Sequence, residues 1–262
     1  MGIVNVTPDS FSDGGQFFER DGKPNTQQAI AHAQRLVEDG ADILDIGGES
    51  TRPGAEVISI QQELDRIMPV VERALTFGLP VSVDTRRPEV MRTVIRSGVD
   101  LINDVNGFRD PQAIDAVADA TCGLCIMHMK GEPATMQANP VYDDVVREVH
   151  DFLIGQRDVM QAAGIDPRRV VVDPGFGFGK NLQHNLELMR SIERLSCIQP
   201  VLVGVSRKSM IGGITGQKIP AERIFGSVAA AIWAAAHGAA ILRVHDVRET
   251  AESLKVWAAL ES

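Results

Sequence analysis

The sequence predicts an α/β fold of the (β/α)₈ TIM-barrel class, built as a single domain over residues 1–262. Two observations predict it: a short apolar run followed by a helical run recurs eight times, and no linker-like stretch interrupts the series. The short runs are almost continuous in Val, Ile and Leu, which is typical of parallel strands that are covered on both faces. A doubly wound open sheet is the alternative arrangement of the same units.

Eight ranges are expected to form the strands. They are 2–6, 42–47, 80–84, 101–105, 124–128, 170–173, 201–205 and 241–245. The segments between them have helical periodicity; in the first of them, Ile30, Ala33 and Val37 follow one face. Glycines stand where helices should end, a position that favours a left-handed residue. These are Gly40, Gly78, Gly98, Gly123, Gly164 and Gly238.

The composition narrows the range of partners. Asp and Glu outnumber Lys and Arg by 35 to 26, so the net charge of −9 and the lack of basic runs disfavour nucleic acid. The longest strongly apolar stretch, 228–236, is too short to span a bilayer, and no secretory signal is evident, so we expect no membrane partner. An odd number of cysteines, three, suits a reducing compartment. We therefore expect a soluble, cytoplasmic protein that must hold any anionic substrate by a local basic cluster.

Polar side chains stand at the carboxyl end of almost every expected strand, and in a barrel all of these ends meet on the catalytic face. They are Asn5, Asp45 with Glu49, Asp84, Asn103 with Asp104, His128, Asp173, Ser206 with Lys208, and Arg243 with His245. Residues two apart on a strand share a face, which groups Arg243 with His245, and Gly204 with Ser206 and Lys208. The alternative, that such residues only satisfy loop backbone, is common for one or two strands but not for eight.

Asp84, Asn103 and Asp173 form the acidic half of the expected site. Burying two carboxylates and an amide is costly unless something pairs with them, and a ligand with several ring N–H groups would do so. The alternative for Asp84 is that it caps the helix that follows Thr85.

The glycine-rich segment Asp173-Pro-Gly-Phe-Gly-Phe-Gly-Lys180 does not fit a nucleotide-binding loop. A phosphate loop requires glycine at position 174 and Ser or Thr after the lysine, where Pro174 and Asn181 stand. We expect instead that the glycines let the backbone approach a flat ligand, with Phe176 or Phe178 as the aromatic surface.

The basic half of the expected site is Ser206-Arg-Lys-Ser209 together with Arg243 and His245. Cations on the last two strand ends predict an anion site, because phosphate groups often bind there in barrels. Surface ion pairing is the alternative. Two polar loops, one after Asn5 and one over 45–54 with Arg52 and Pro53, would cover the mouth.

In combination these motifs resemble those of the dihydropteroate synthase family. The resemblance runs in order over about residues 1–257, although the short hairpin that usually precedes the first strand is absent from this sequence. The matching stretches are Asn5-Val-Thr-Pro-Asp-Ser-Phe-Ser-Asp-Gly, Gly47-Gly-Glu-Ser-Thr-Arg-Pro-Gly, Ser82-Val-Asp-Thr, Ile102-Asn-Asp, Met127-His-Met, Asp173-Pro-Gly-Phe-Gly-Phe-Gly-Lys, Ser206-Arg-Lys-Ser and Arg243-Val-His-Asp.

The resemblance implies a reaction and a set of roles. The reaction joins 6-hydroxymethyl-7,8-dihydropterin diphosphate to p-aminobenzoate, releases diphosphate and yields 7,8-dihydropteroate for folate. It implies that the pterin is bound by Asp84, Asn103, Asp173 and Lys208 and contacted by Met127 and Phe178, and that the diphosphate is bound by Asn5, Arg243 and His245. Gly204 is a further implied substrate-binding residue. It also implies that Asn5 binds Mg²⁺, and that Thr51, Arg52, Pro53, Ser206 and Phe178 form the p-aminobenzoate site. The implied catalytic residues are Asn5, Asp84, Asp173, Lys208, Arg243 and His245.

Two other functions are weighed against this one. A pterin-binding methyltransferase would share the barrel and the ring-binding residues but would have no use for the basic half of the site. A catalytically silent barrel paralogue that serves as a partner-binding subunit is the other alternative, and the presence of every motif residue disfavours it. A homodimer is expected because the helix over 228–236 is apolar all round, which leaves an outward face to cover.

Overall fold

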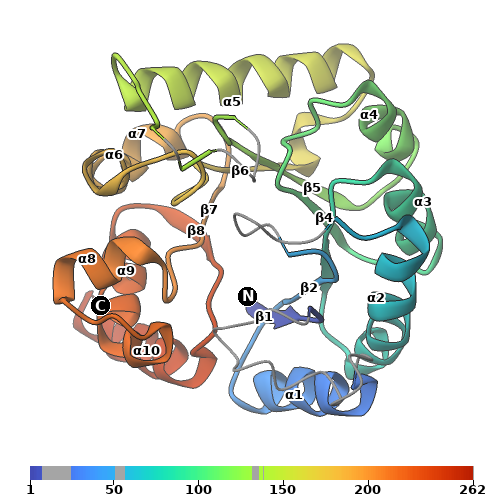
Figure 1. The fold of residues 1–262 in the computed structure, drawn as a ribbon, viewed down its shortest axis with the longest axis horizontal. Coiled ribbons are helices and arrows are strands. Elements are labelled where there is room, and N and C mark those ends of the chain that lie inside the picture. Colours follow the sequence, from blue (N-terminus) through green and yellow to red (C-terminus); the bar gives the residue numbers. More distant parts are fainter. Residues whose placement is uncertain (8–24, 51–56, 132–135, 138, 262) are drawn as a thin grey trace.

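The computed structural model describes residues 1–7, 25–50, 57–131, 136–137 and 139–261. Eight parallel strands lie side by side in chain order (Figure 1). They are β1 Gly2–Asn5, β2 Leu44–Gly47, β3 Val81–Asp84, β4 Leu101–Asp104, β5 Gly123–Met127, β6 Val170–Asp173, β7 Val201–Val203 and β8 Ala239–Leu242. The sheet closes on itself, because Val244, just past β8, bridges Gly2 in parallel and its carbonyl accepts a hydrogen bond from the amide of Ile3 at 3.1 Å. The barrel prediction is confirmed, and the open-sheet alternative is wrong.

Helices surround the strands and follow them in sequence (Figure 1). They are α1 Thr26–Glu38, α2 Ile60–Ala74, α3 Pro88–Arg96, α4 Pro111–Val117, α5 Val145–Ala162, α6 Leu182–Arg190, α7 Ile192–Ser196, α8 Ser209–Thr215, α9 Ile224–Ala236 and α10 Val247–Glu261, with short 3₁₀ turns η1 Leu75–Phe77, η2 Pro167–Arg169 and η3 Pro220–Glu222. Among the described helices, none is long and apolar enough to cross a membrane.

Local sequence sets where several helices begin and end. α2 starts at a capping box, in which the Ser59 hydroxyl accepts from the Gln62 amide and the Gln62 side chain accepts from the Ser59 amide. Five of the six glycines expected at helix ends adopt positive φ, from +79° to +96°. Gly123 does not; it begins β5 instead, since the strand extends one residue further back than its apolar run indicated.

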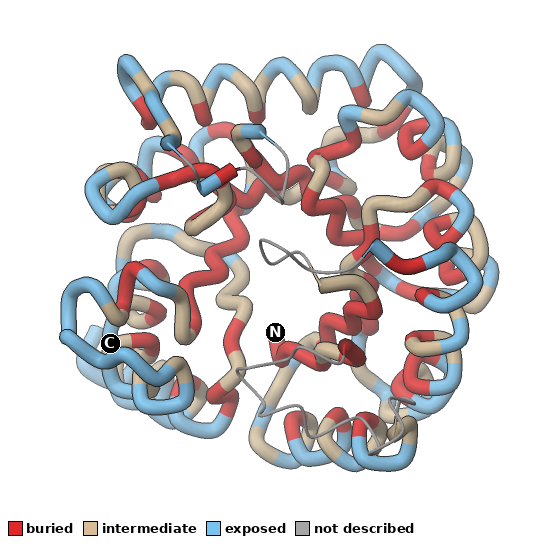
Figure 2. The backbone as a smooth tube through the Cα atoms, in the orientation of Figure 1, coloured by how far each residue is buried: buried red, intermediate tan, exposed pale blue. Residues whose placement is uncertain are grey.

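The barrel interior changes from apolar to polar along the strands. Its floor is one layer of packed side chains, to which seven strands or strand approaches contribute: Met1, Ile43, Leu101, Cys125, Val171, Leu202 and Ile241. Because side chains alternate with a period of two, the next inward layer lies two residues further on. Polar groups enter there, among them Asp45, Asn103, Asp173 and Arg243. The outward residues of most strands pack in the main hydrophobic core. Most of the tube along β1 to β7 is accordingly red in Figure 2, whereas β8 is not.

The last strand differs from its expected range. It spans Ala239–Leu242 rather than 241–245, because Ala239, which carries little strand signal, pairs with Val201 of β7, and the register shifts before Leu202 pairs with Ile241. Arg243 remains in register beyond the strand end, since its amide donates to the Val203 carbonyl at 2.9 Å. The expected alternation therefore still holds at Arg243 and His245.

Candidate active site

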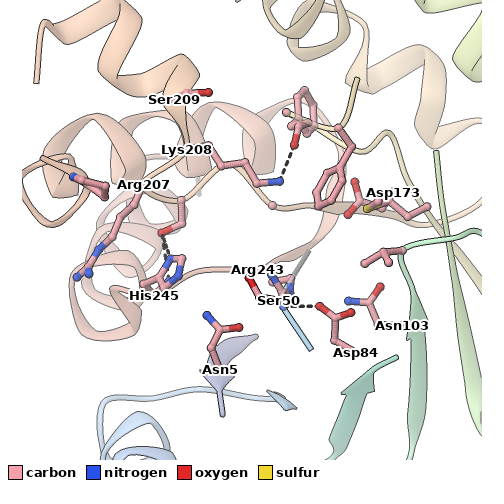
Figure 3. Close-up of a pocket in the computed structure, with 18 of the residues that line it drawn as sticks. Asn5, Ser50, Asp84, Asn103, Asp173, Arg207, Lys208, Ser209, Arg243 and His245 are labelled. Atoms are coloured by element: carbon pink, nitrogen blue, oxygen red, sulfur yellow. Dashed lines mark hydrogen bonds and ion pairs between the residues drawn. The ribbon is translucent and has the colours of Figure 1, made fainter. Parts of the chain in front are cut away.

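A cavity of about 590 Å³ opens at the carboxyl ends of the strands. Every predicted site residue within the described chain lines it: Asn5, Asp84, Asn103, Met127, Asp173, Phe178, Gly204, Ser206, Lys208, Arg243 and His245 (Figure 3). The predicted residues Thr51, Arg52 and Pro53 lie outside the described residues. Side chains that are as much as 240 residues apart in sequence thus meet in one hollow, which is what the strand-end pattern predicted.

Arg243 lies at the floor of the cavity between two carboxylates. Its Nε donates to Asp45 Oδ2 at 2.5 Å. Its Nη2 donates to Asp84 Oδ2 at 3.0 Å (Figure 3). Burial works against the charge of Arg243, but the two carboxylates outweigh it and raise its pKa. Asp84 does not cap α3, whose capping position is held by Arg87 without a side-chain hydrogen bond, so that alternative is wrong.

Of the two predicted ring-binding carboxylates, Asp173 is buried and Asp84 is half-buried. Burial raises the pKa of Asp84 to about 7; Arg243 opposes the rise, while Asp45 and Asp104 add to it. Burial also raises the pKa of Asp173, against the nearby charge of Lys208 and a hydrogen bond from the Gly175 amide at 2.7 Å. Burying such carboxylates costs free energy, and a ligand that donates hydrogen bonds to them would reduce that cost.

Lys208 supplies the cation that faces the acidic side of the cavity. Its Nζ donates to the Phe176 carbonyl at 2.6 Å and lies 4.9 Å from the centre of the Phe178 ring (Figure 3). Burial lowers the pKa of Lys208 to about 8, with Asp173 opposing. Phe178 is thus the aromatic surface of the site, whereas the Phe176 ring is fully buried in the core.

The glycine-rich segment after β6 approaches another backbone more than it approaches a ligand. A Cβ on Gly175, whose φ is +69°, would lie 1.8 Å from the His128 carbonyl oxygen, and one on Gly179 2.3 Å from that of Lys130. Only Gly177 of the three lines the cavity. The expectation that these glycines admit a flat ligand is therefore wrong for Gly175 and Gly179, which admit the backbone that follows β5, and for Gly177 it stays a prediction.

Lys180, which ends that segment, holds its loop together. Its buried Nζ contacts His128 Nδ1 at 2.9 Å and donates to the carbonyls of Gly175 at 2.9 Å and Phe178 at 3.0 Å. Burial lowers the pKa of both Lys180 and His128. The Lys180 ammonium group is therefore occupied by loop carbonyls. This agrees with the conclusion from sequence that the segment is not a nucleotide-binding loop.

The two arginines of the basic half have different partners: Arg243 bonds to carboxylates at the cavity floor, whereas Arg207 bonds to Asp246. Arg207 also lines the cavity, but its guanidinium pairs with Asp246 through two contacts, at 3.0 and 2.5 Å, in a largely buried ion pair. Its φ is +57°, and the Ser227 hydroxyl accepts from its amide at 2.8 Å. This left-handed turn lets Ser206 and Lys208 on either side reach the cavity, where the Ser206 hydroxyl contacts His245 Nδ1 at 3.1 Å (Figure 3).

Some lining residues could not be found from sequence. Met136 and Gln137 come from the irregular segment between β5 and α5, and Arg223 from the turn before α9. Met136 packs with Val105 and Met127 below Phe178, and the Gln137 amide donates to the Gly177 carbonyl. No periodic or motif signal marked these positions, because their place depends on how the two loops pack together.

Comparison with known proteins decides the family. The family model described as pterin binding enzyme matches residues 1–245. A dihydropteroate synthase of Neisseria meningitidis serogroup B is 52% identical, over 99% of this chain and 92% of the relative. This chain belongs to the dihydropteroate synthase family. The resemblance seen in the motifs is confirmed, and the chain is a transferase of folate biosynthesis.

Solved structures of the family agree with the fold. The dihydropteroate synthase of Xanthomonas albilineans with 4-aminobenzoic acid is 50% identical, with a TM-score of 0.91, covering all of this chain and 92% of that one. Another structure from that organism, in complex with 7,8-dihydropteroate, is 48% identical, with a TM-score of 0.88, covering 100% of this chain and 93% of that chain. The fold of these dihydropteroate synthases is therefore shared along the whole chain.

Proposed function

We propose that the cavity binds the pterin at its acidic side and the diphosphate at its basic side, and joins the pterin methylene to the amine of p-aminobenzoate. The observation that supports this most is the pairing of hydrogen-bond acceptors and cations in one hollow. Asp84, Asn103 and Asp173 offer acceptors to ring N–H groups, with Met127 and Phe178 against the ring faces and Lys208 as the donor. Relatives that bind the substrate and the product, as their structures state, support the same assignment.

The diphosphate end of the proposed site is Asn5, Arg243 and His245. Within the described part of the chain, the contacts to Asp45 and Asp84 use the Nε–H and one Nη2–H of Arg243. A guanidinium has five N–H groups, so three remain to reach phosphate oxygens. His245, oriented by its contacts to Ser206 at 3.1 Å, adds a further donor.

Asn5 fits a role as a Mg²⁺ ligand. It lies at the end of β1 and lines the cavity, and an amide oxygen is a ligand that Mg²⁺ accepts. No cluster of three or more His, Cys, Asp or Glu side chains suited to a metal occurs among the described residues. This suits Mg²⁺, which is usually held by one or two protein groups together with phosphate oxygens and water. When bound, the ion would stabilise negative charge on the leaving diphosphate.

The chemistry proposed for the chain's own residues is electrostatic. As the bond from methylene to diphosphate lengthens, positive charge develops on the pterin and negative charge on the leaving group. Asp84 and Asp173 stabilise the first, and Arg243 and His245 the second. The amine of p-aminobenzoate, held by Thr51, Arg52, Pro53, Ser206 and Phe178, then bonds to the methylene carbon and gives up a proton. This scheme uses no covalent nucleophile.

A diphosphate-release assay tests the proposal. Release that requires p-aminobenzoate supports it. Release without p-aminobenzoate, or none with both substrates, overturns it, and methyl transfer from a methylated pterin would favour the methyltransferase alternative. Pterin binding without turnover would indicate the silent paralogue.

The pH dependence of kcat/KM for the pterin diphosphate should be bell-shaped, with its maximum between pH 7 and 8. Asp84, with a pKa near 7, must lose its proton to accept from the ring, so activity falls as the pH drops below that value. Lys208, with a pKa near 8, must keep its proton, so activity falls as the pH rises above it. A pH–rate profile checks this. Constant kcat/KM from about pH 6 to pH 9 would contradict the assigned roles.

We also propose that the protein is a homodimer through α9 and α10. Phe225, Ala229, Trp233 and Ala236 form an outward stripe on α9 at helical spacing, and Phe225 is 90% exposed. Leu260 on the adjoining α10 is 81% exposed. Light scattering at micromolar concentration should give twice the mass of one chain, and Phe225→Glu with Trp233→Glu should shift it toward the monomer. A fully active monomer at that concentration would contradict the idea.

A further inference from the structure

Asp45 is a buried carboxylate that contacts two residues of the proposed site without lining the cavity itself. Its side chain, on β2, is 0% exposed. Its Oδ1 accepts from the Ser82 hydroxyl at 2.6 Å. Its Oδ2 accepts from Arg243 Nε at 2.5 Å and from Asn103 Nδ2 at 3.4 Å. Both Arg243 and Asn103 do line the cavity.

These contacts settle which way the Asn103 amide points. An ionised carboxylate only accepts hydrogen bonds, so the amide must turn its NH₂ group toward Asp45. Its oxygen then faces away from Asp45. Asn103 Oδ1 is buried, and no partner for it occurs among the described residues. Buried polar atoms are rarely left unpaired, so this oxygen is an acceptor held ready for a donor.

A ligand can supply that donor. Asn103 lies beside Asp84 in the sheet register, so the two acceptors stand on neighbouring strands at the same level. A pterin carries ring N–H and amino groups that can donate to such a pair. Without Asp45, the amide could equally turn its NH₂ into the cavity, where it would oppose those donors.

We propose that Asp45 is a positioning residue for pterin recognition: it orients the Asn103 amide as an acceptor and holds the Arg243 guanidinium at the cavity floor. This rests on the proposed function in that the ligand is taken to be the pterin. Asp45 touches no substrate in this scheme and acts only through Asn103 and Arg243. Ser82, by donating to the other carboxylate oxygen, fixes the plane of Asp45 in turn.

Asp45→Asn is the direct test, with Asp104→Asn as its matched control. Asp104 is equally buried and stands next to Asn103 on β4, but it accepts from the Asn106 and Phe108 amides, both at 2.7 Å, in the turn beyond the strand. Calorimetry with 6-hydroxymethyl-7,8-dihydropterin alone should show affinity on the order of 10- to 100-fold weaker for Asp45→Asn. Asp104→Asn should change pterin affinity far less, because it contacts neither Asn103 nor Arg243 and acts on the site only through its charge on Asp84, while it should lose comparable resistance to urea.

A double-mutant cycle separates positioning from a general structural effect. In an Asn103→Ala background the Asp45→Asn change should cost much less pterin affinity than in the wild type, because its main target is gone. Equal costs in the two backgrounds, or unchanged affinity in Asp45→Asn, would overturn the proposal. If Asp45→Asn does not fold, Ser82→Ala decides: it keeps the charge but frees the carboxylate plane, and should weaken pterin binding several-fold.

This experiment is separable from the test of the reaction. The affinities are measured with the pterin alone, so they do not depend on turnover. A wild type that binds the pterin but releases no diphosphate would overturn the proposed reaction and leave the role of Asp45 standing. Unchanged pterin affinity in Ser82→Ala, with Asp45→Asn unfolded, would overturn the role of Asp45 alone.

Discussion

Arg243→Met should lower kcat/KM for the pterin diphosphate by about 100- to 1,000-fold, the range seen when one group that stabilises developing charge is removed. Arg243 bonds to the carboxylates of Asp45 and Asp84, and it is also part of the proposed diphosphate site. Its loss removes stabilisation of the leaving group. It also leaves Asp45 and Asp84, 0% and 19% exposed, without the cation that pairs them.

The same variant should lose stability. Breaking a buried ion pair by removing one partner typically costs about 3–5 kcal/mol, because the remaining charge stays buried. Arg87→Met provides the control: Arg87 also joins two carboxylates, Glu49 at 2.6 Å and Glu63 at 3.1 Å, with similar exposure, but it does not line the cavity. Urea unfolding should show comparable losses in the free energy of unfolding for the two variants. Steady-state kinetics should show a much smaller loss in kcat/KM for Arg87→Met than for Arg243→Met.

Arg243→Lys sharpens the distinction between charge and shape. A lysine keeps a positive charge at the floor but loses the planar fork that can bond two carboxylates and a phosphate together. It should restore part of the stability and little of the activity. Activity close to the wild type in either variant would mean that Arg243 serves the fold only and that the leaving group is stabilised elsewhere.

Asp173→Asn should weaken pterin binding by at least about 2 kcal/mol, or roughly 30-fold. The amide keeps one oxygen, which can still accept from the Gly175 amide at 2.7 Å. Its NH₂ group then replaces the second acceptor, so a donor would face the ring N–H groups. Asp173 is 5% exposed, and water cannot readily relieve that clash.

Calorimetry with the pterin measures this loss directly. Asp104→Asn again serves as the control, because it removes a buried carboxylate whose pKa burial raises to about 6 without changing the cavity lining. The pKa of Lys208 should also fall in Asp173→Asn, since Asp173 is the charge that most opposes the lowering of that pKa by burial. In Asp173→Asn the alkaline limb of the pH–rate profile should therefore move to lower pH. Pterin affinity equal to that of the wild type would refute the role of Asp173.

The sequence alone predicted where the candidate site lies, at the carboxyl ends of the strands. Apolar runs that end in polar residues, repeated eight times, can satisfy burial only if the strands are covered and their carboxyl ends gather on one face. The period of two along each strand then places Arg243 with His245, and Gly204 with Ser206, in the same hollow. These are local constraints, carried by neighbouring residues, and so they can be read without a structure.

The partners within the site were decided only by the tertiary structure. Arg243 pairs with Asp45, 198 positions away in the chain, whereas Arg207 pairs with Asp246 and Lys180 with loop carbonyls. Nothing local distinguishes these three cations, because each is a basic residue near a strand end. What separates them is the register between distant strands, the closure of β8 onto β1, and the left-handed turn at Arg207. Hydrogen bonds act over about 3 Å, so which acceptor each cation meets depends on coordinates that only the closed barrel sets.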